Sequence, residues 1–501
     1  MYKRQLLYDD VFEVEERILA NGDIEVALNA DDARKLLETV RQKGYESIAI
    51  VLMHGFKFPR HEKTLAKIAY DIGFKQISVS HNVSPLVKIV SRGQTTIVDA
   101  YLTPILKRYV DQVSGALGID KPGELLFMQS SGGLIDANSF RGRDAILSGP
   151  AGGIVGAVYT ARLAGFDKLI AFDMGGTSTD VSHYAGEYEK AYETEVAGVQ
   201  MRIPMMHINT VAAGGGSILK YEDGRFQVGP ESAGAQPGPL AYRKNGHLAV
   251  TDINVVLGKI QPDFFPHIFG PNQDQPIDTD ASKAEFQKIA NQVGDNRSAE
   301  DVAEGFLDIA NEHMAQAIKK ISLARGYDLK DYVLNCFGGA GGQHACLVAE
   351  KLGIKTILLH PMSGVLSAYG MGLADIRQEK QATFEKPLTA KNMNELKALV
   401  STLEQETHQA MEKQGVSASE LNDEYFVFIR YKGTDTSLRV TLNDHMNMQK
   451  DFEALHKKQF GFVSPERQLI VGTVVVESFG CLLYTSPSPR DATLSRMPSS
   501  A

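Results

Sequence analysis

The stretch FDMGGTSTD, residues Phe172–Asp180, decides the fold of this chain. The apolar run Lys168–Phe172 and the alternating run Thr179–Tyr184 predict two antiparallel strands that meet at the glycine pair. Adjacent glycines let the backbone bend sharply and bring its N–H groups close to an anion, because no Cβ stands in the way. Three hydroxyl side chains and two carboxylates lie within the same nine residues. Such a turn suits the phosphates of a nucleotide and an accompanying divalent cation.

The residue types in this stretch predict separate roles. A turn between two strands differs from the strand, loop and helix of a P-loop, and the lysine of that motif is absent. The order suits the hairpin phosphate loop of actin-like ATPases, and the alternative is a tight hairpin whose polar side chains only cap the turn. We expect Asp173 and Asp180 to hold Mg²⁺ and to serve in catalysis. The residues expected to contact the phosphates of ATP are Gly175, Gly176, Thr177, Ser178 and Thr179.

A second glycine-rich segment is CFGGAGGQHA, residues Cys336–Ala345. It lies between the predicted strand Asp331–Phe337 and the predicted helix Gln343–Leu352, so the nucleotide can approach both the backbone and the positive end of the helix dipole. Close packing is the alternative explanation of these glycines. The residues expected to contact the nucleotide here, chiefly its adenosine, are Gly338, Gly339, Gly341, Gly342 and His344.

Two further glycine-rich segments have weaker signals. Ser148–Gly153 is predicted to be a turn that positions a helix at a hinge between lobes. Val211–Ser217 follows a predicted strand, Met206–Val211, and its Gly214 and Gly215 are expected to face the γ-phosphate or the substrate. A mobile surface loop is the alternative for this last segment.

The remaining pattern predicts an α/β chain. Asn29 is a predicted helix N-cap with Gly44 at the helix end, and strands and helices alternate up to a long helix, Ile97–Leu117, interrupted by Pro104. Another long helix is predicted at Ala303–Arg325, and a break at Lys380–Lys391. The expected parts are the remainder of an N-terminal lobe (6–165), a nucleotide-binding lobe (166–380) and a partial C-terminal α+β domain (390–480).

Composition excludes several classes of protein. The net charge of −9 argues against a general nucleic-acid binder, and no apolar run is long enough to span a membrane. The three cysteines have no disulfide or metal spacing, which suits a reducing cytoplasm. No HxxxH or HxH pair supports a metal cluster, and no GxSxG motif indicates an acyl-enzyme.

The two ends have an unusual composition. The peptides MYKRQ, CLLYTSPSPRD and SRMPSSA match reading frames of a transposase-type sequencing adapter, with a natural low-complexity tail as the alternative. We therefore expect residues 1–5 and 481–501 to be adapter-derived and Leu6–Gly480 to be an internal piece of a longer gene.

With these motifs the chain resembles the hydantoinase A/oxoprolinase family, and within it the ATP-dependent 5-oxoprolinase branch. The resemblance covers essentially Leu6–Gly480. Gly342-Gln343 stands where hydantoinase relatives usually have a proline-leucine pair, and the SHYAGEYE continuation favours the oxoprolinase branch. The most specific segments are DAILSGPAGGIVGA (144–157), FDMGGTSTDVSHYAGEYE (172–189), HINTVAAGGGSIL (207–219), VGPESAGAQPGP (228–239), GKIQPDFFP (258–266) and CFGGAGGQHAC (336–346).

The resemblance implies actin-like, ribonuclease H-like ATPase lobes with a C-terminal α+β domain. It further implies the reaction of 5-oxo-L-proline with ATP and two waters to L-glutamate, ADP and phosphate, with Mg²⁺, in a homo-oligomer. Family members also have an earlier phosphate hairpin and a hydantoinase B-like half, fused or separate, so this chain alone is expected to be inactive. The alternatives are the ATP-using subunit of a hydantoinase or a related lactam- or ketone-activating complex, and an actin- or chaperone-like ATPase switch.

Overall fold

The computed structural model describes residues 7–119, 121–196 and 198–480, so the segments expected to be adapter-derived lie outside the described residues. The chain forms two compact units, and it passes between them more than once. Among the described residues, unit 1 consists of 7–119, 121–146, 192–196, 198–204 and 374–480. Unit 2 consists of Leu147–Ala191 and Met205–Leu373.

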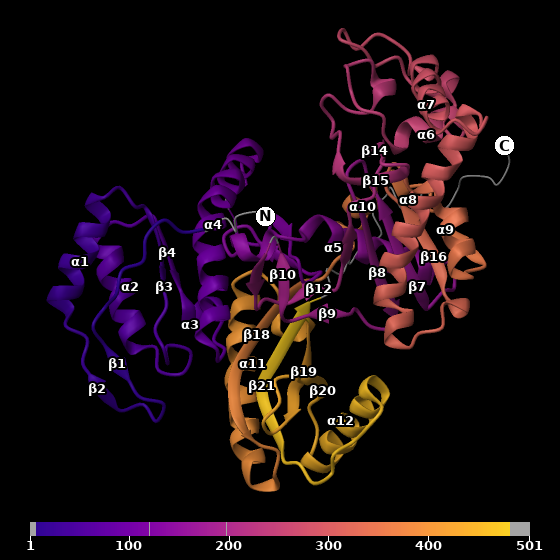
Figure 1. Ribbon diagram of the computed structural model, residues 1–501. Coiled ribbons are helices and arrows are strands. Elements are labelled where there is room, and N and C mark those ends of the chain that lie inside the picture. The colour runs from indigo at the N-terminus through magenta and orange to yellow at the C-terminus, as the bar shows by residue number, and fades with distance from the viewer. Residues whose placement is uncertain (1–6, 120, 197, 481–501) are drawn as a thin grey trace. The chain divides into compact units, whose positions relative to one another are not determined.

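Unit 2 is organised by a five-stranded sheet with the order β13-β8-β7-β16-β17. The predicted hairpin is present, because β7 (Lys168–Met174) and β8 (Thr179–Ala185) pair antiparallel. β13 (Asn209–Val211) extends the antiparallel side, whereas β16 (Val333–Phe337) and β17 (Thr356–Leu358) run parallel to β7 (Figure 1). Both phosphate-loop candidates therefore follow neighbouring strands, β7 and β16.

Helices cover both faces of this sheet. Side chains alternate along a strand, so Ile170, Phe172 and Met174 of β7 enter the main core, together with apolar residues of α8 (Ala299–Ile321). On the opposite face, Asn335 of β16 donates to the carbonyl of Ala157 in α5 (Ser148–Leu163) at 2.8 Å. α8 begins four residues earlier than predicted, because Ser298 and Asp301 form a capping box at its start.

The glycines of Ser148–Gly153 form the first turns of α5, and the predicted turn is absent. They allow α5 to pack tightly on α10 (Leu366–Met371). A Cβ on Gly370 would lie 2.0 Å from the carbonyl oxygen of Gly152, and a Cβ on Gly156 would lie 2.6 Å from the carbonyl oxygen of Leu366. This segment is therefore a helix–helix contact within unit 2.

The remaining elements of unit 2 complete its layers. In order these elements are β9 (Lys190–Ala191), β12 (Met205–Met206), β14 (Ser217–Glu222), β15 (Arg225–Ser232), α6 (Val250–Val256), α7 (Thr279–Val293) and α9 (Ala345–Leu352). β9 and β12 pair antiparallel, and so do β14 and β15.

Unit 1 contains a six-stranded sheet with the order β20-β19-β21-β18-β6-β5. Its long central strands, β18 (Ile376–Pro387) and β21 (Leu469–Gly480), pair antiparallel over most of their length. β18 includes residues 380–387, so the break predicted at Lys380–Lys391 is wrong over most of its length. The pairing of Ile376 with Leu134 joins the C-terminal strands to β6, so 390–480 shares one sheet with residues from the N-terminal part. The predicted boundary at 165 also differs, since the first segment of unit 1 ends at Ile146 and α5 belongs to unit 2.

The long helix α4 (Ile89–Leu117) of unit 1 contains Pro104 and is not interrupted by it. Proline has no N–H to donate to the carbonyl four residues earlier, which is that of Ala100. The Ser47 hydroxyl donates to this carbonyl at 2.6 Å and replaces the missing helical bond. A side chain from β3 (Ser47–Ile50) therefore lets the helix continue through a helix-breaking residue.

The N-terminal part of unit 1 confirms the predicted cap. The Asn29 side chain accepts from the N–H groups of Asp31 and Asp32 at the start of α1 (Ala30–Gln42), and Gly44 follows its end with φ of +95°. β3 pairs in parallel with β4 (Gln76–Val79) alone, and a hollow of about 1010 Å³ lies beside β3. Among the described helices, none is long and apolar enough to cross a membrane.

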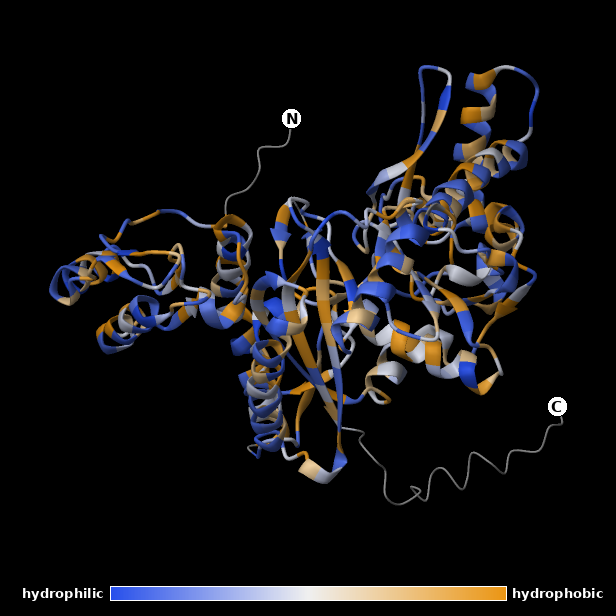
Figure 2. Ribbon diagram, turned by 90° about the horizontal axis from the view of Figure 1, so that it is seen from below, coloured by the Kyte–Doolittle hydropathy of each residue, from blue (hydrophilic) through white to orange (hydrophobic). Residues whose placement is uncertain are grey.

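Several helices, among them α1 and α8, are amphipathic, and hydrophilic and hydrophobic colours lie side by side along helices in Figure 2. The remaining elements of unit 1 are β1 (Arg17–Ile18), β2 (Ile24–Val26), α2 (Arg60–Ile72), α3 (Ser80–Val83), β5 (Leu126–Met128), β6 (Leu134–Asp136), β10 (Thr194–Val196), β11 (Val199–Met201), α11 (Met393–Glu412), β19 (Leu421–Tyr431), β20 (Leu438–Thr441) and α12 (His445–Phe460).

Candidate functional site

The tip of the β7–β8 hairpin presents unpaired backbone donors. Gly175 N–H donates to the Ser178 carbonyl at 3.0 Å and closes the turn. In the part of the chain that the structure describes, the N–H groups of Gly176, Thr177 and Ser178 have no hydrogen-bond acceptor, and Gly176 and Thr177 are exposed. Consecutive unpaired N–H groups of this kind form a concave anion site, and the hydroxyls of Thr177 and Ser178 add donors.

Asp173 and Asp180 are direct partners across this hairpin. Both are half-buried, and Thr210 of β13 donates its hydroxyl to Asp180 Oδ1 at 2.5 Å. Burial, and then the charge of Asp180, raise the pKa of Asp173 to about 6. Burial also raises the pKa of Asp180, although the hydrogen bond from Thr210 opposes this. Like charges on facing strand positions repel, and a divalent cation between them would relieve the repulsion.

The loop Gly214–Gly216 is attached to the hairpin and buried. Gly215 N–H donates to the Gly175 carbonyl at 3.1 Å, and Gly216 N–H donates to the Gly176 carbonyl at 2.6 Å. A Cβ on Gly214 would lie 2.6 Å from the nitrogen of Ser178, so only glycine permits this approach. The alternative of a mobile surface loop does not fit this packing.

The loop after β16 passes directly over Asp173. Gly338 has φ of +84°, and a Cβ on it would lie 2.4 Å from Asp173 Oδ1. Ala340 N–H donates to the Met174 carbonyl at 3.0 Å, which holds the loop to the end of β7. Gly339 and Gly342 are exposed, whereas Gly341 is buried against the thiol of Cys336. The three glycine loops therefore meet at the carboxyl end of β7.

His344 lies behind this loop and is fully buried. Its Nδ1 is 2.8 Å from Asn311 Oδ1 and its Nε2 is 3.1 Å from Asn254 Nδ2, so neither ring nitrogen remains for a nucleotide. Burial, and then the charge of Lys259, lower the pKa of His344 to about 4, which keeps the ring neutral. The ring supports the loop from inside, and the expected direct contact of this imidazole with a nucleotide does not fit the geometry.

The helix α6 connects two of the glycine loops. Thr251 donates from both its N–H and its hydroxyl to the Gly215 carbonyl, at 2.7 and 2.9 Å. Asn254 holds His344, and Lys259, three residues after the helix, donates to the Gln343 carbonyl at 3.0 Å. The sequence analysis missed all three residues, and it missed Thr210. Their contacts depend on strand register and on helix placement, which local patterns do not specify.

Most of the predicted site residues lie together, and some of them support the loops instead. Unit 2 brings together Asp173, Asp180, the hairpin turn, Gly214, Gly215 and Gly338. Thr179 of the predicted phosphate set is buried, and its hydroxyl donates to the Ala213 carbonyl, so it links two loops. No contact between the two units is needed to describe the site.

The chain matches known protein families over most of its length. The model of the Hydantoinase/oxoprolinase family matches residues 92–380, and that of the Hydantoinase/oxoprolinase N-terminal region matches residues 1–73. 5-Oxoprolinase 1 of Arabidopsis thaliana is 40% identical over 97% of this chain and 41% of its own length. 5-Oxoprolinase of Saccharomyces cerevisiae is 41% identical over 89% of this chain and 36% of its own length. The chain thus spans well under half of these relatives.

Two relatives extend the comparison to other reactions. Caprolactamase subunit alpha of Pseudomonas jessenii is 30% identical over 90% of this chain and 66% of its own length. The crystal structure of ATP-dependent caprolactamase from Pseudomonas jessenii superposes with a TM-score of 0.82 and 27% identity, over 94% of this chain and 70% of that one. A nucleotide-free structure of acetone carboxylase superposes with a TM-score of 0.70 and 23% identity, over 95% of this chain and 70% of that one, and supports the fold alone.

Proposed function

The chain belongs to the hydantoinase/oxoprolinase family, and from this premise we propose that it carries the ATP site of an enzyme that opens a cyclic amide by hydrolysis. The first proposed substrate is 5-oxo-L-proline, with L-glutamate, ADP and phosphate as products. The named 5-oxoprolinases among its relatives support this choice. Because those relatives are much longer, the activity is proposed for the whole protein of which this chain forms a part.

One observation carries the proposal. Two facing carboxylates, Asp173 and Asp180, lie beside a turn with three unpaired N–H groups. The first arrangement favours a divalent cation and the second favours phosphate, and nucleoside triphosphates bind with Mg²⁺. The loop Gly214–Gly216 hydrogen-bonds to this turn, and the loop Gly338–Gly342 packs on Asp173 and Met174 at the end of β7.

The strand order supports an actin-like, ribonuclease H-like lobe for unit 2. In chain order, the strands of the main sheet are β7, β8, β13, β16 and β17. β8 pairs with β7 and β13 pairs with β8, whereas β16 and β17 follow in parallel on the other side of β7. In this architecture the hairpin between the first two strands and the loop after the fourth lie at one edge. Those are the positions of Gly175–Ser178 and Gly338–Gly342 here.

The chemistry of a lactam explains the need for ATP. Amide resonance makes the ring carbonyl a poor electrophile, and phosphorylation of the amide oxygen removes the resonance and creates a leaving group. Positioning and charge stabilisation account for most of the catalysis of phosphoryl transfer. The N–H groups of Gly176, Thr177 and Ser178 would bind phosphate oxygens, and Asp173 and Asp180 would hold Mg²⁺ directly or through water. The bound Mg²⁺ would neutralise charge on the phosphates as the γ-phosphoryl group leaves.

The attack of water on the phosphorylated ring is assigned to no residue of this chain. We place this step in a hydantoinase B-like half, either fused to this chain in the whole protein or present as a separate subunit. The length of the 5-oxoprolinases beyond the matched part agrees with the first arrangement. The word subunit in the name of the caprolactamase relative agrees with the second.

A related lactam is the second candidate substrate. The caprolactamase structure gives a TM-score of 0.82 over nearly the whole chain, so the same ATP unit can serve a larger ring in a relative. The ring that is turned over is therefore to be decided by experiment, with 5-oxoproline, hydantoin and caprolactam compared directly.

The test uses the protein from the complete gene. ADP release is measured with each of the three lactams, and glutamate is measured with 5-oxoproline. We expect ADP and glutamate in equal amounts with 5-oxoproline and loss of both in Asp173→Asn. The control Asp274→Asn changes an exposed aspartate of unit 2 and should have no effect. Turnover of hydantoin or caprolactam alone would show that 5-oxoproline is not the substrate. Nucleotide-dependent partner binding without turnover of any lactam would contradict the proposal.

A further inference from the structure

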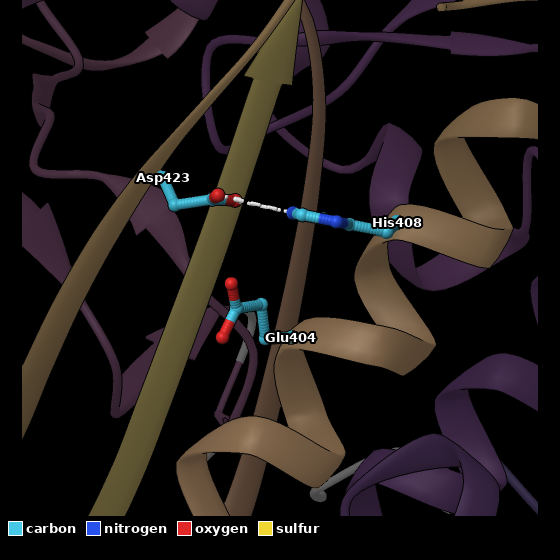
Figure 3. A group of neighbouring side chains, drawn as sticks. All are labelled: Glu404, His408 and Asp423. Atoms are coloured by element: carbon cyan, nitrogen blue, oxygen red, sulfur yellow. Dashed lines mark hydrogen bonds and ion pairs between the residues drawn. The ribbon is translucent and has the colours of Figure 1, made fainter. Parts of the chain in front are cut away.

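A cluster of three potential metal ligands lies in unit 1. Glu404 and His408 are four residues apart on α11, so they project from the same face on successive turns (Figure 3). Asp423 projects toward them from β19, which belongs to the six-stranded sheet. These residues share no element with the candidate nucleotide site of unit 2. The cluster contains a single histidine, so HxxxH and HxH pairs do not indicate it.

The distances within the cluster suit a shared ion. His408 Nε2 lies 3.0 Å from each carboxylate oxygen of Asp423. One ligand atom from each of the three residues lies within 4.8 Å of the other two. Because bonds from Zn²⁺ to nitrogen or oxygen are about 2.0–2.2 Å long, ligand atoms that share one ion lie within about 4.4 Å of one another, so the three side chains need to draw together only slightly around it. All three side chains are half-buried, so an ion can reach them from solvent.

Buried hydroxyl groups hold the Asp423 carboxylate. Ser478 donates its hydroxyl to Asp423 Oδ1 at 2.5 Å, and Ser478 is itself 2.7 Å from the hydroxyl of Thr407. Ser478 and Thr407 are fully buried. Such outer hydrogen bonds orient the ligands of protein metal sites.

The charge of the cluster is left unbalanced by the protein. In the part of the chain that the structure describes, neither Glu404 nor Asp423 forms an ion pair with a lysine or an arginine. A divalent ion would balance both carboxylates, and imidazole is a common ligand of such ions.

We propose that Glu404, His408 and Asp423 bind a divalent transition metal, with Zn²⁺ as the principal candidate, and that this ion joins α11 to β19. One imidazole and two carboxylates form a mixed nitrogen and oxygen set, which suits Zn²⁺ and disfavours Mg²⁺ and Ca²⁺. Three protein ligands leave a fourth position for water. The ion stabilises unit 1 because it connects a helix to the strand beneath it.

The test measures Zn²⁺ binding to the full chain after removal of metals and of any affinity tag. We expect one tight Zn²⁺ per chain by calorimetric titration and a rise of the melting temperature on Zn²⁺ addition. His408→Ala and Asp423→Asn should each weaken this binding by about tenfold or more. Cobalt substitution should give the absorption of a low-coordinate ion, and His408→Ala should remove it.

Matched controls separate this site from other effects. His313→Ala removes an exposed histidine from α8, and Glu406→Gln removes an exposed carboxylate from α11, so both should leave the binding unchanged. Asp173→Asn should also leave it unchanged, which separates it from the proposed nucleotide site. Circular dichroism shows whether His408→Ala is folded, and Asp423→Asn preserves side-chain volume if it is not. Equal Zn²⁺ binding by the chain and by folded His408→Ala or Asp423→Asn would overturn the proposal, as would absence of stoichiometric binding.

Discussion

Asn254 Nδ2 lies 3.1 Å from Nε2 of His344, and this buried contact connects α6 to the glycine loop after β16. The same helix holds the Gly215 carbonyl through Thr251. One short helix therefore positions two glycine loops, whose glycines have no side chains with which to hold themselves in place. The stiffness of the site depends on residues outside the glycine motifs.

Replacement of Asn254 by leucine should destabilise unit 2. The change leaves Nε2 of a fully buried histidine without a donor, and a buried unsatisfied group costs about 1–3 kcal/mol. Chemical unfolding of the purified chain measures this loss. Asn291→Ala, at an exposed position of α7, is the control and should change the unfolding free energy by less than about 0.5 kcal/mol. Equal stability of the two variants would show that the contact contributes nothing.

The stability of the chain should fall in mild acid because of His344. Its pKa is about 4 in the folded protein and 6.5 in the unfolded chain, so the unfolded chain binds more protons between these values. The stability from the neutral ring is complete above pH 6.5 and is lost as the pH falls toward 4, by roughly 3 kcal/mol for a fully buried ring. Unfolding free energies of the chain and of His344→Gln, measured from pH 7 to pH 4, should converge as the pH falls. Parallel curves would contradict the assignment.

Asp173→Asn should stabilise the chain at neutral pH and abolish binding of Mg²⁺ with ATP. The pKa of Asp173 is about 6 in the folded protein and 3.8 in the unfolded chain, so the folded protein holds its proton more tightly. The resulting stability is complete below pH 3.8 and is lost as the pH rises through 6, which leaves a repulsive charge beside Asp180 at pH 7. Removal of this charge should increase the unfolding free energy by up to about 3 kcal/mol.

Melting curves with and without Mg²⁺ and a non-hydrolysable ATP analogue test both parts of this prediction. Mg²⁺ with the ATP analogue should raise the melting temperature of the unchanged chain and should not change the melting temperature of Asp173→Asn. The gain from the substitution itself should disappear below about pH 4. Asp274→Asn should behave like the unchanged chain at every pH. A variant that loses stability at pH 7 would refute the proposed repulsion.

Gly338→Ala should weaken nucleotide binding far more than Gly353→Ala. Both glycines have positive φ, +84° and +71°, so alanine brings a similar backbone cost of about 1–2 kcal/mol at each. Only at Gly338 does the added Cβ meet another group, Asp173 Oδ1 at 2.4 Å, whereas at Gly353 nothing lies within 4 Å. Titration with the ATP analogue should show the difference. Equal affinities would mean that the loop can shift without disturbing Asp173.

Local sequence signals located most of the hairpin and its loops. The glycine pair between two apolar runs correctly predicted the β7–β8 turn, although a Cβ would meet no atom closer than 3.9 Å at Gly175 and none within 4 Å at Gly176. The Asn29 cap and the Gly44 ending were also read correctly, since they depend on contacts within a few residues. Pro104 misled the prediction, because the hydroxyl that compensates for it comes from Ser47, far away in the sequence.

Sequence patterns alone predicted the β7–β8 hairpin, the glycine loop after β16, the Asn29 cap and the membership of a family. Each of these follows from residue types at short spacing. Only the tertiary structure decided that His344 is enclosed by Asn254 and Asn311, that residues 376–387 join a sheet with 134–136, and that Glu404 and His408 meet Asp423. Those contacts join segments through packing, and packing depends on the register and placement of whole elements, which no short pattern encodes.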